Sequence, residues 1–175
     1  MYYLYDAIEM IRRFMEAGGQ VLWGVAIATF LLWALAFERF LYFNFQMRRD
    51  IDAVIGIWEA RPERKSWAAH AIRAKMISEM REKIFANLPM IKTLVACCPL
   101  LGLLGTVTGM VEVFNILAVT GGADAKSMAG GVSRATIPTM AGMVAAIAGV
   151  FANTVISRIA AREAELLEDH LTADH

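Results

Sequence analysis

Three long stretches of the chain carry no charged residue: 21–37, 93–111 and 135–157. Each approaches or exceeds the roughly 20 helical residues that cross the hydrocarbon core of a bilayer. The first stretch ends at Glu38 and Arg39 but continues apolar through residue 45, and the second continues past Glu112 to residue 120. The pattern predicts three transmembrane helices, at residues 20–43, 90–119 and 133–156.

The first stretch has an alternative interpretation as a cleaved signal peptide. Arg12 and Arg13 precede it, and the Ala-Leu-Ala sequence at 34–36 resembles a signal-peptidase site. However, the apolar run is longer than the usual core of a signal peptide, and the two later stretches already require membrane insertion. These features favour an uncleaved helix.

Helical periodicity continues outside the three stretches. Apolar residues recur at three- and four-residue spacing on three polar segments, as expected for helices with one buried face. The positions are Ile51, Val54, Ile55 and Trp58; Ile77, Met80, Ile84, Leu88 and Ile91; and Ile156, Ala160, Ala164, Leu167 and Leu171. These stripes indicate helices that extend the membrane helices and pack together. We therefore predict one all-α membrane domain over 1–175, with a Gly-rich hairpin loop at 121–131 joining the second and third spans.

The basic residues predict the orientation of the helices. Nine lysines and arginines lie between Arg48 and Lys83, whereas the N-terminal tail has two and the short second loop has Lys126. Loops that are rich in lysine and arginine stay in the cytoplasm. The prediction is a membrane protein with residues 1–19 and 120–132 outside the cytoplasm and residues 44–89 and 157–175 in the cytoplasm.

Composition excludes several functional classes. Of the 175 residues, 58% are hydrophobic and 19% charged, and the net charge is zero. That balance gives no indication of nucleic-acid binding. Cys97 and Cys98 are adjacent in an apolar helix without nearby histidines, so they suggest neither a disulfide framework nor a metal site. We find no pairing of nucleophile and base and no phosphate-binding loop, and we expect no enzymatic activity and no cofactor.

Small residues recur on the second and third predicted helices. Such spacing lets helix backbones approach closely, which is how membrane helices associate without a hydrophobic driving force. The positions are Gly102, Gly105 and Gly109 on the second helix, and Ala141, Ala145 and Gly149 on the third. Because three helices in one chain offer few internal surfaces, we expect these faces to form a homo-oligomer within the lipid bilayer.

Prolines and charges inside the helices are the strongest polar signals. Pro99 and Pro138 each remove one amide donor, so we expect them to kink their helices. Glu112 and Arg134 are costly in a membrane and therefore need a partner or a function. The simpler alternative is that both lie at the outer headgroup boundary and face water.

Two runs at these positions resemble the ExbB/TolQ/MotA proton-channel family. PLLGLLGTVTGM at 99–110 is similar to the second-helix motif of ExbB and TolQ, and GVSRATIPTMAGMVAAI at 131–147 to their third-helix motif. The order of the three helices and the position of the loops agree. The short ExbB proteins of second-type TonB systems are the most similar, through WEAR at 58–61, ERKSW at 63–67 and ELLEDHL at 165–171.

The resemblance implies a mechanism. In this family five subunits form a ring, and their second and third helices line a pore that holds the transmembrane helices of an ExbD dimer. An aspartate of ExbD carries protons, and the resulting motion reaches outer-membrane receptors through TonB, with TtpC as a further partner in second-type systems. The resemblance implies an ExbB-like role in energising siderophore import, with Thr106 and Thr139 facing the pore.

The chain departs from the family at two charged positions. Typical relatives have glutamate where this chain has Arg134 and a neutral residue where it has Glu112. A guanidinium stays protonated, so Arg134 cannot relay protons. Glu112 lies about 9 Å outward of Thr106 and Arg134 about 7.5 Å outward of Thr139, at 1.5 Å per residue. This nearly equal depth predicts an ion pair, within one subunit or between neighbours.

Other functions within the same family stay open at this stage. A TolQ-like stator for maintaining the cell envelope would use the same machinery with different partners. A structural scaffold that conducts no protons gains support from Arg134. A MotA-like flagellar role is less favoured because the cytoplasmic segment is short for transmitting torque.

Overall fold

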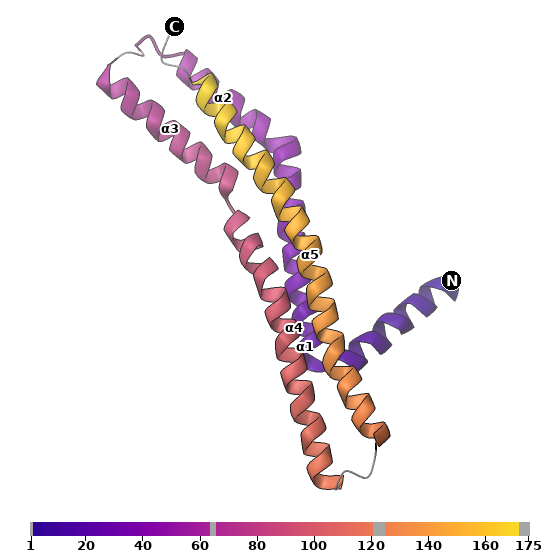
Figure 1. Ribbon diagram of the computed structural model, residues 1–175. Helices are drawn as coiled ribbons and strands as arrows, with labels where there is room; N and C mark the ends of the chain where they lie inside the picture. Colours follow the sequence, from indigo (N-terminus) through magenta and orange to yellow (C-terminus); the bar gives the residue numbers. More distant parts are fainter. Residues whose placement is uncertain (1, 64–65, 121–124, 172–175) are drawn as a thin grey trace. The chain divides into compact units, whose positions relative to one another are not determined.

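The computed structural model describes residues 2–63, 66–120 and 125–171, and every element in these ranges is a helix. The elements are α1 (Tyr2–Leu41), the π-helix η1 (Tyr42–Gln46), α2 (Met47–Glu59), α3 (Trp67–Phe85), α4 (Leu88–Thr120) and α5 (Ala125–His170). Three helical stretches are long and apolar enough to cross a membrane. The predicted all-α class with three spans is confirmed (Figure 1).

The chain divides into two compact units. Unit 1 contains Met1–Trp33 and Thr93–Val150, and unit 2 contains Ala34–Lys92 and Phe151–His175. Each unit therefore combines segments that are distant in the sequence. Unit 1 carries most of the uncharged stretches, and unit 2 carries most of the amphipathic extensions.

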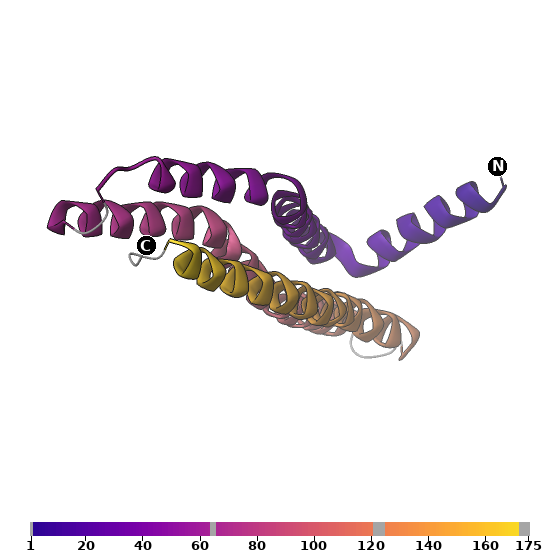
Figure 2. The same cartoon turned by 90° about the horizontal axis from the view of Figure 1, so that it is seen from above.

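Gly19 bends α1 within unit 1. Its φ of 66° and ψ of −162° are not helical, and this backbone region is accessible essentially only to glycine. The neighbouring Gly18 packs on Leu22 so closely that an added Cβ would overlap the leucine side chain. The bend separates a charged N-terminal helix, residues 2–18, from the apolar part of α1 (Figures 1 and 2). The sequence analysis did not predict this helix or the bend.

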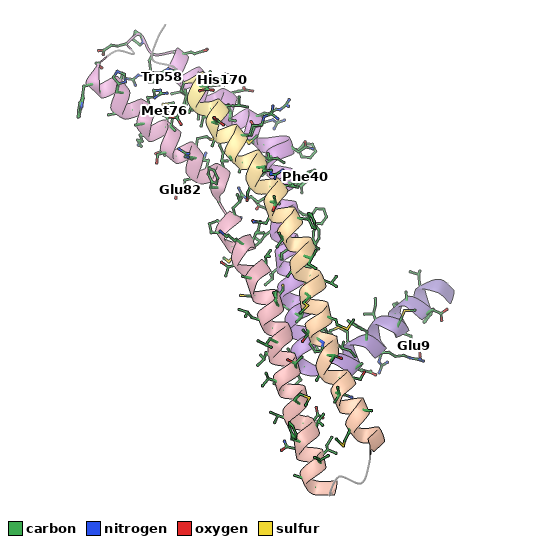
Figure 3. The ribbon with its side chains drawn as sticks, in the orientation of Figure 1. Glu9, Phe40, Trp58, Met76, Glu82 and His170 are labelled. Carbon is green, nitrogen blue, oxygen red and sulfur yellow. The ribbon has the colours of Figure 1, made fainter. Side chains whose placement is uncertain are left out.

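The three amphipathic stripes form the core of unit 2. Trp58, Met80, Ile84, Leu167 and Leu171 are at most 2% exposed and belong to one hydrophobic cluster. The cluster also contains Leu88, Ile156, Ala160 and Ala164, with Ile51, Val54, Ile55 and Ile77 packed against it. The interpretation of these stripes as helix-packing faces is confirmed. Trp58 and Met76 lie near the end of the unit that also carries His170 (Figure 3).

Polar contacts fix the connections of unit 2. Ser66 caps α3 by accepting a hydrogen bond from the Ala69 amide at 3.2 Å. Asn87, with φ of 63°, breaks the helix between α3 and α4 and donates to the Glu38 carboxylate at 3.0 Å. Arg73 donates to the carbonyls of Glu168 and Leu171 and so caps the last turn of α5. A cation at the carboxyl end of a helix also interacts favourably with the helix dipole.

Arg39 is buried in unit 2 although it follows a long apolar run. Its side chain is 8% exposed and lies 2.9 Å from the Glu38 carboxylate. It also donates to the Lys83 carbonyl at 2.9 Å and covers the Tyr42 ring at 5.0 Å from the centroid. Burying a guanidinium is tolerated when its donors are paired in this way. The sequence analysis treated Arg39 only as the end of a span.

The predicted hairpin loop is wrong in its second half. Residues 121–124 lie outside the described residues, but α5 already begins at Ala125 and includes Gly130 and Gly131. The two glycines were taken as turn residues, although glycine also serves where helices approach closely. Gly131 packs against Val113, where an added Cβ would overlap the valine side chain.

Candidate functional site

The closest helix contact in unit 1 joins the glycines of α4 to α5. A Cβ built on Gly102 would lie 2.8 Å from the Thr139 Cα, and one on Gly109 would lie 2.7 Å from the Ala135 Cα. A Cβ on Gly105 would lie 2.5 Å from the Pro138 Cβ. Real Cβ atoms do not approach other carbons this closely. The glycines at 102, 105 and 109 therefore let the two backbones touch.

Two glycines of α5 complete this contact. A Cβ on Gly142 would lie 2.5 Å from the Cys98 carbonyl oxygen, and one on Gly149 would lie 2.7 Å from Val95 and 2.8 Å from Leu32 of α1. The sequence analysis did not single out Gly142, because it falls outside the four-residue step from Ala141. Ala145 is buried and Ala141 is half-buried.

This geometry corrects the argument for an oligomer. The small-residue faces were expected to need a second copy of the chain, but within unit 1 the glycines already pack against α5, α4 and α1. What α4 and α5 leave uncovered is a set of large apolar side chains, each at least half exposed. They are Leu100, Leu103, Val107, Val111 and Phe114 on α4, and Met140, Met143, Val144, Ile147 and Val150 on α5.

The two threonines of the predicted pore use their hydroxyls differently. Thr139 donates across the contact to the Gly102 carbonyl at 2.7 Å. Thr106 donates within its own helix to the Leu103 carbonyl at 2.7 Å. A threonine hydroxyl has one proton to donate and two acceptor lone pairs. Both side chains therefore keep acceptor capacity, and Thr139 also links α4 to α5.

The two prolines lie inside continuous helices. Pro99 is within α4 and Pro138 within α5, and each helix continues on both sides. The Pro138 ring is buried against Gly105. Glycine on α4 thus makes room for the ring that proline brings to α5. Neither helix is interrupted at its proline. Within the helices described for unit 1, the residue with non-helical backbone angles is Gly19.

Glu112 and Arg134 line the same pocket. It has a volume of about 380 Å³ and lies between the bend of α1, α4 and α5, with Glu16, Gly19, Gln20 and Thr108 also in its wall. Ion pairs of the described residues include Arg12–Glu16, Arg13–Glu9, Arg39–Glu38 and Lys75–Glu79, and Glu112 and Arg134 form none with each other. The single chain thus brings Glu112 and Arg134 together without a direct ion pair. A pair between neighbouring subunits stays a prediction.

The fold and this packed helix contact define a class of protein. The chain has three helices that are apolar enough to cross a membrane, and glycines pack two of them closely. In unit 1, Glu16, Glu112 and Arg134 lie together in one pocket at the end of the uncharged stretches. These features are typical of a polytopic membrane protein. The sequence model of the MotA/TolQ/ExbB proton channel family matches residues 33–169. The chain belongs to this family.

Individual relatives agree with the family assignment. The chain is 38% identical over 102 residues to the biopolymer transport protein ExbB-like 1 of Synechocystis sp., covering 57% of this chain and 39% of the relative. It is 36% identical over 104 residues to the Tol-Pal system protein TolQ of Pseudomonas aeruginosa, covering 59% and 43%. It is 32% identical over 96 residues to the biopolymer transport protein ExbB of Xanthomonas campestris pv. campestris, covering 55% and 38%. Each match spans less than half of the relative's length.

Proposed function

We propose that this chain is the ExbB-like subunit of an inner-membrane motor driven by the proton-motive force. In this proposal it works with an ExbD-type partner and transmits energy through TonB to outer-membrane import of siderophores and similar cargo. The observation that carries the proposal is the tight α4–α5 contact built from Gly102, Gly105, Pro138 and Thr139. A motor ring needs walls that stay rigid while a central helix moves, and close backbone packing provides that rigidity.

The apolar side chains left exposed on α4 and α5 support a ring of several copies. Lipid tails can cover such side chains, and so can the next subunit. We propose a pentamer in which part of each exposed face contacts a neighbour and part faces the ExbD helices. Purification of the chain with its ExbD-type partner, followed by mass measurement of the intact complex, tests this directly. A monomer under conditions that retain the partner would contradict the ring.

The state of the threonine hydroxyls suggests how they would treat a moving carboxyl group. Because Thr139 and Thr106 donate their protons to carbonyls, each has only acceptor capacity to offer a partner. An acceptor binds a protonated carboxylic acid, which donates, and disfavours a carboxylate, which only accepts. In this proposal the threonines stabilise the protonated aspartate of ExbD inside the ring and leave its deprotonation to other sites.

A valine substitution tests this role. Thr139→Val and Thr106→Val together keep the shape of both side chains and remove both hydroxyls. We expect the double variant to assemble with ExbD but to lose energised siderophore uptake in cells that lack their own copy. Uptake at the level of the unmodified chain would remove the threonines from the mechanism. Thr29→Val is the matched control, because the Thr29 hydroxyl donates to the Val25 carbonyl of its own helix α1.

We further propose that the N-terminus lies in the periplasm and the C-terminus in the cytoplasm. The support is the concentration of lysine and arginine between Arg48 and Lys83. A reporter enzyme fused after Pro62 should be active only in its cytoplasmic form. Activity of a periplasmic reporter at that position would overturn the orientation.

A TolQ-like role in maintaining the cell envelope is the second candidate. The chain is 36% identical to a TolQ and 32% identical to an ExbB, which favours neither partner set. Expression in two host strains separates them, one lacking ExbB and the other lacking TolQ. We expect rescue of siderophore uptake and not of detergent resistance. Rescue of detergent resistance alone would favour the TolQ-like role. Proton flux through liposomes that hold the chain with and without ExbD tests the third candidate. A complex that assembles normally but conducts no protons would favour the non-conducting scaffold.

A further inference from the structure

The polar pocket of unit 1 borders an apolar groove. The groove, with a volume of about 540 Å³, is lined by Ile8, Ile11, Met15 and Trp23 and by polar residues at the bend of α1. It shares Glu16, Gly19 and Gln20 with the polar pocket. The bend at Gly19 therefore forms one wall of both. A charged pocket joined to an apolar groove matches the shape of an amphiphile.

The charges in the pocket have both signs. Arg12 pairs with Glu16 at 2.9 Å, so that carboxylate already has a partner. The Thr108 hydroxyl donates to carbonyls of its own helix, at 3.0 Å to Leu104. This leaves the Glu112 carboxylate and the Arg134 guanidinium, for which the described chain provides neither an ion pair nor a hydrogen bond to each other. Both residues are exposed, so their side chains are open to a ligand that enters the pocket.

The pocket lies at one end of the uncharged zone. The apolar stretches 21–37, 93–111 and 135–157 begin or end beside Gln20, Glu112 and Arg134, all of which line the pocket. The level at which charges first occur on membrane helices is the level of the lipid headgroups. On the N-terminal helix before the bend, Ile8 and Ile11 are exposed and line the groove, whereas Glu9 of the same helix (Figure 3) does not line it. That distribution is typical of a helix lying in the headgroup layer.

We propose that the bend of α1 binds one zwitterionic glycerophospholipid whose headgroup carries a primary ammonium. Its phosphodiester pairs with the Arg134 guanidinium, its ammonium donates to the Glu112 carboxylate, and one acyl chain follows the groove past Ile11 to Trp23. A guanidinium matches the geometry of phosphate oxygens, and a carboxylate accepts hydrogen bonds from an ammonium. The polar pocket is within the range of about 300–1,000 Å³ that is usual for small-molecule sites.

This chemistry distinguishes ethanolamine from the other common headgroups. A choline headgroup has no N–H to donate to Glu112. A glycerol headgroup carries no cation and would bring a net negative charge beside the Glu112 carboxylate. Of these three headgroups, ethanolamine is the one that offers a charge-assisted hydrogen bond to both Glu112 and Arg134.

Native mass spectrometry of the detergent-solubilised chain tests the preference. The probes are phosphatidylethanolamine, phosphatidylcholine and phosphatidylglycerol with identical acyl chains. We expect ethanolamine lipid to be retained over choline lipid by roughly tenfold, the ratio expected for one charge-assisted hydrogen bond. Glu112→Gln should abolish this preference, and Arg134→Gln should reduce retention of all three lipids. Equal retention of the three lipids by the unmodified chain would overturn the proposal.

Matched controls and a second measurement keep the test independent of folding. Glu82→Gln and Arg162→Gln alter exposed residues of unit 2, and Glu82 projects away from α3 (Figure 3); both should leave lipid retention unchanged. Acyl-brominated phosphatidylethanolamine should quench Trp23 more strongly than brominated phosphatidylcholine does, measured as the difference between the unmodified chain and Trp23→Phe. If neighbouring copies instead pair Glu112 directly with Arg134, neither the lipid preference nor the selective quenching will occur.

Discussion

Replacing Gly102 by alanine perturbs the α4–α5 contact where the added Cβ meets backbone atoms of α5. The added Cβ would lie 2.8 Å from the Thr139 Cα and 3.0 Å from the Pro138 carbonyl oxygen. Both neighbours are backbone atoms, so no side-chain rotation can relieve the overlap. Carbon atoms prefer a separation of at least about 3.5 Å, so the backbones would have to separate locally by roughly 0.7 Å.

The same movement weakens a hydrogen bond. The Thr139 hydroxyl lies 2.7 Å from the Gly102 carbonyl, and adding roughly 0.7 Å takes it beyond the usual range for such bonds. Overpacking a tight contact costs about 1–3 kcal/mol. A hydrogen bond between membrane helices contributes about 0.6 kcal/mol on average and at most about 1.7. We therefore expect Gly102→Ala to lower the free energy of unfolding by roughly 2 to 5 kcal/mol relative to a matched control.

Gly24→Ala is that control. Gly24 is also a helical glycine of unit 1, but an added Cβ there meets nothing within 4 Å. Both substitutions gain the same helix propensity, at most about 1 kcal/mol, so this gain cancels in the comparison. Reversible unfolding in mixed detergent micelles, followed by circular dichroism, measures the difference. If the two alanine variants agree within about 0.5 kcal/mol, α4 and α5 are not in backbone contact and the reasoning fails.

Three further predictions concern single polar contacts. Thr139→Val should lower the free energy of unfolding by about 0.6–1.7 kcal/mol because it removes the hydrogen bond to α4. Thr106→Val should change the free energy little, since the Thr106 hydroxyl bonds within its own helix. Equal effects of the two substitutions in the same micelle assay would contradict the helix-to-helix bond. Arg39→Leu should lower the free energy of unfolding by about 1.5–3 kcal/mol, because the hydrogen bonds to Glu38 and Lys83 are lost. Arg48→Leu, at an exposed arginine, should change it by no more than about 0.5 kcal/mol. If Arg39→Leu leaves the free energy of unfolding unchanged, the guanidinium is not buried. Arg73→Gln should speed amide hydrogen exchange at residues 166–171, because it weakens the cap of α5. The stabilisation lost with the helix dipole is about 0.3–1 kcal/mol. Unchanged exchange at these residues would exclude the cap.

The spans and the packing stripes could be predicted because each is local in the sequence. A transmembrane helix satisfies its own backbone hydrogen bonds, so an uncharged run of sufficient length specifies it without reference to the rest of the chain. The same holds for the stripe from Ile156 to Leu171, where helical periodicity alone marked the residues that the structure buries. The motif runs at 99–110 and 131–147 likewise carried the family resemblance, which the family match confirms.

The partners of individual residues depended on the tertiary structure. The spacing of Gly102, Gly105 and Gly109 predicted a close contact but not its partner, because any helix with a complementary surface could have filled it. The structure selects Ala135, Pro138 and Thr139 of the same chain. Arg39 and the Glu112–Arg134 pocket were undecided for a similar reason. Whether a charge is buried, paired or open to a ligand depends on what lies opposite, and sequence separation gives no measure of that distance.

The bend at Gly19 shows most directly what the sequence alone could not predict. A glycine pair before an apolar run is compatible with a straight helix, a flexible tail or a sharp turn, since glycine permits all three. Only the folded chain selects a positive φ at Gly19 and places the bend against α4 and α5 in unit 1. The sequence by itself determined which segments are helical and apolar, because those properties arise within each segment. The tertiary structure decided which surfaces meet, because that choice depends on shape and charge contributed by two segments at once.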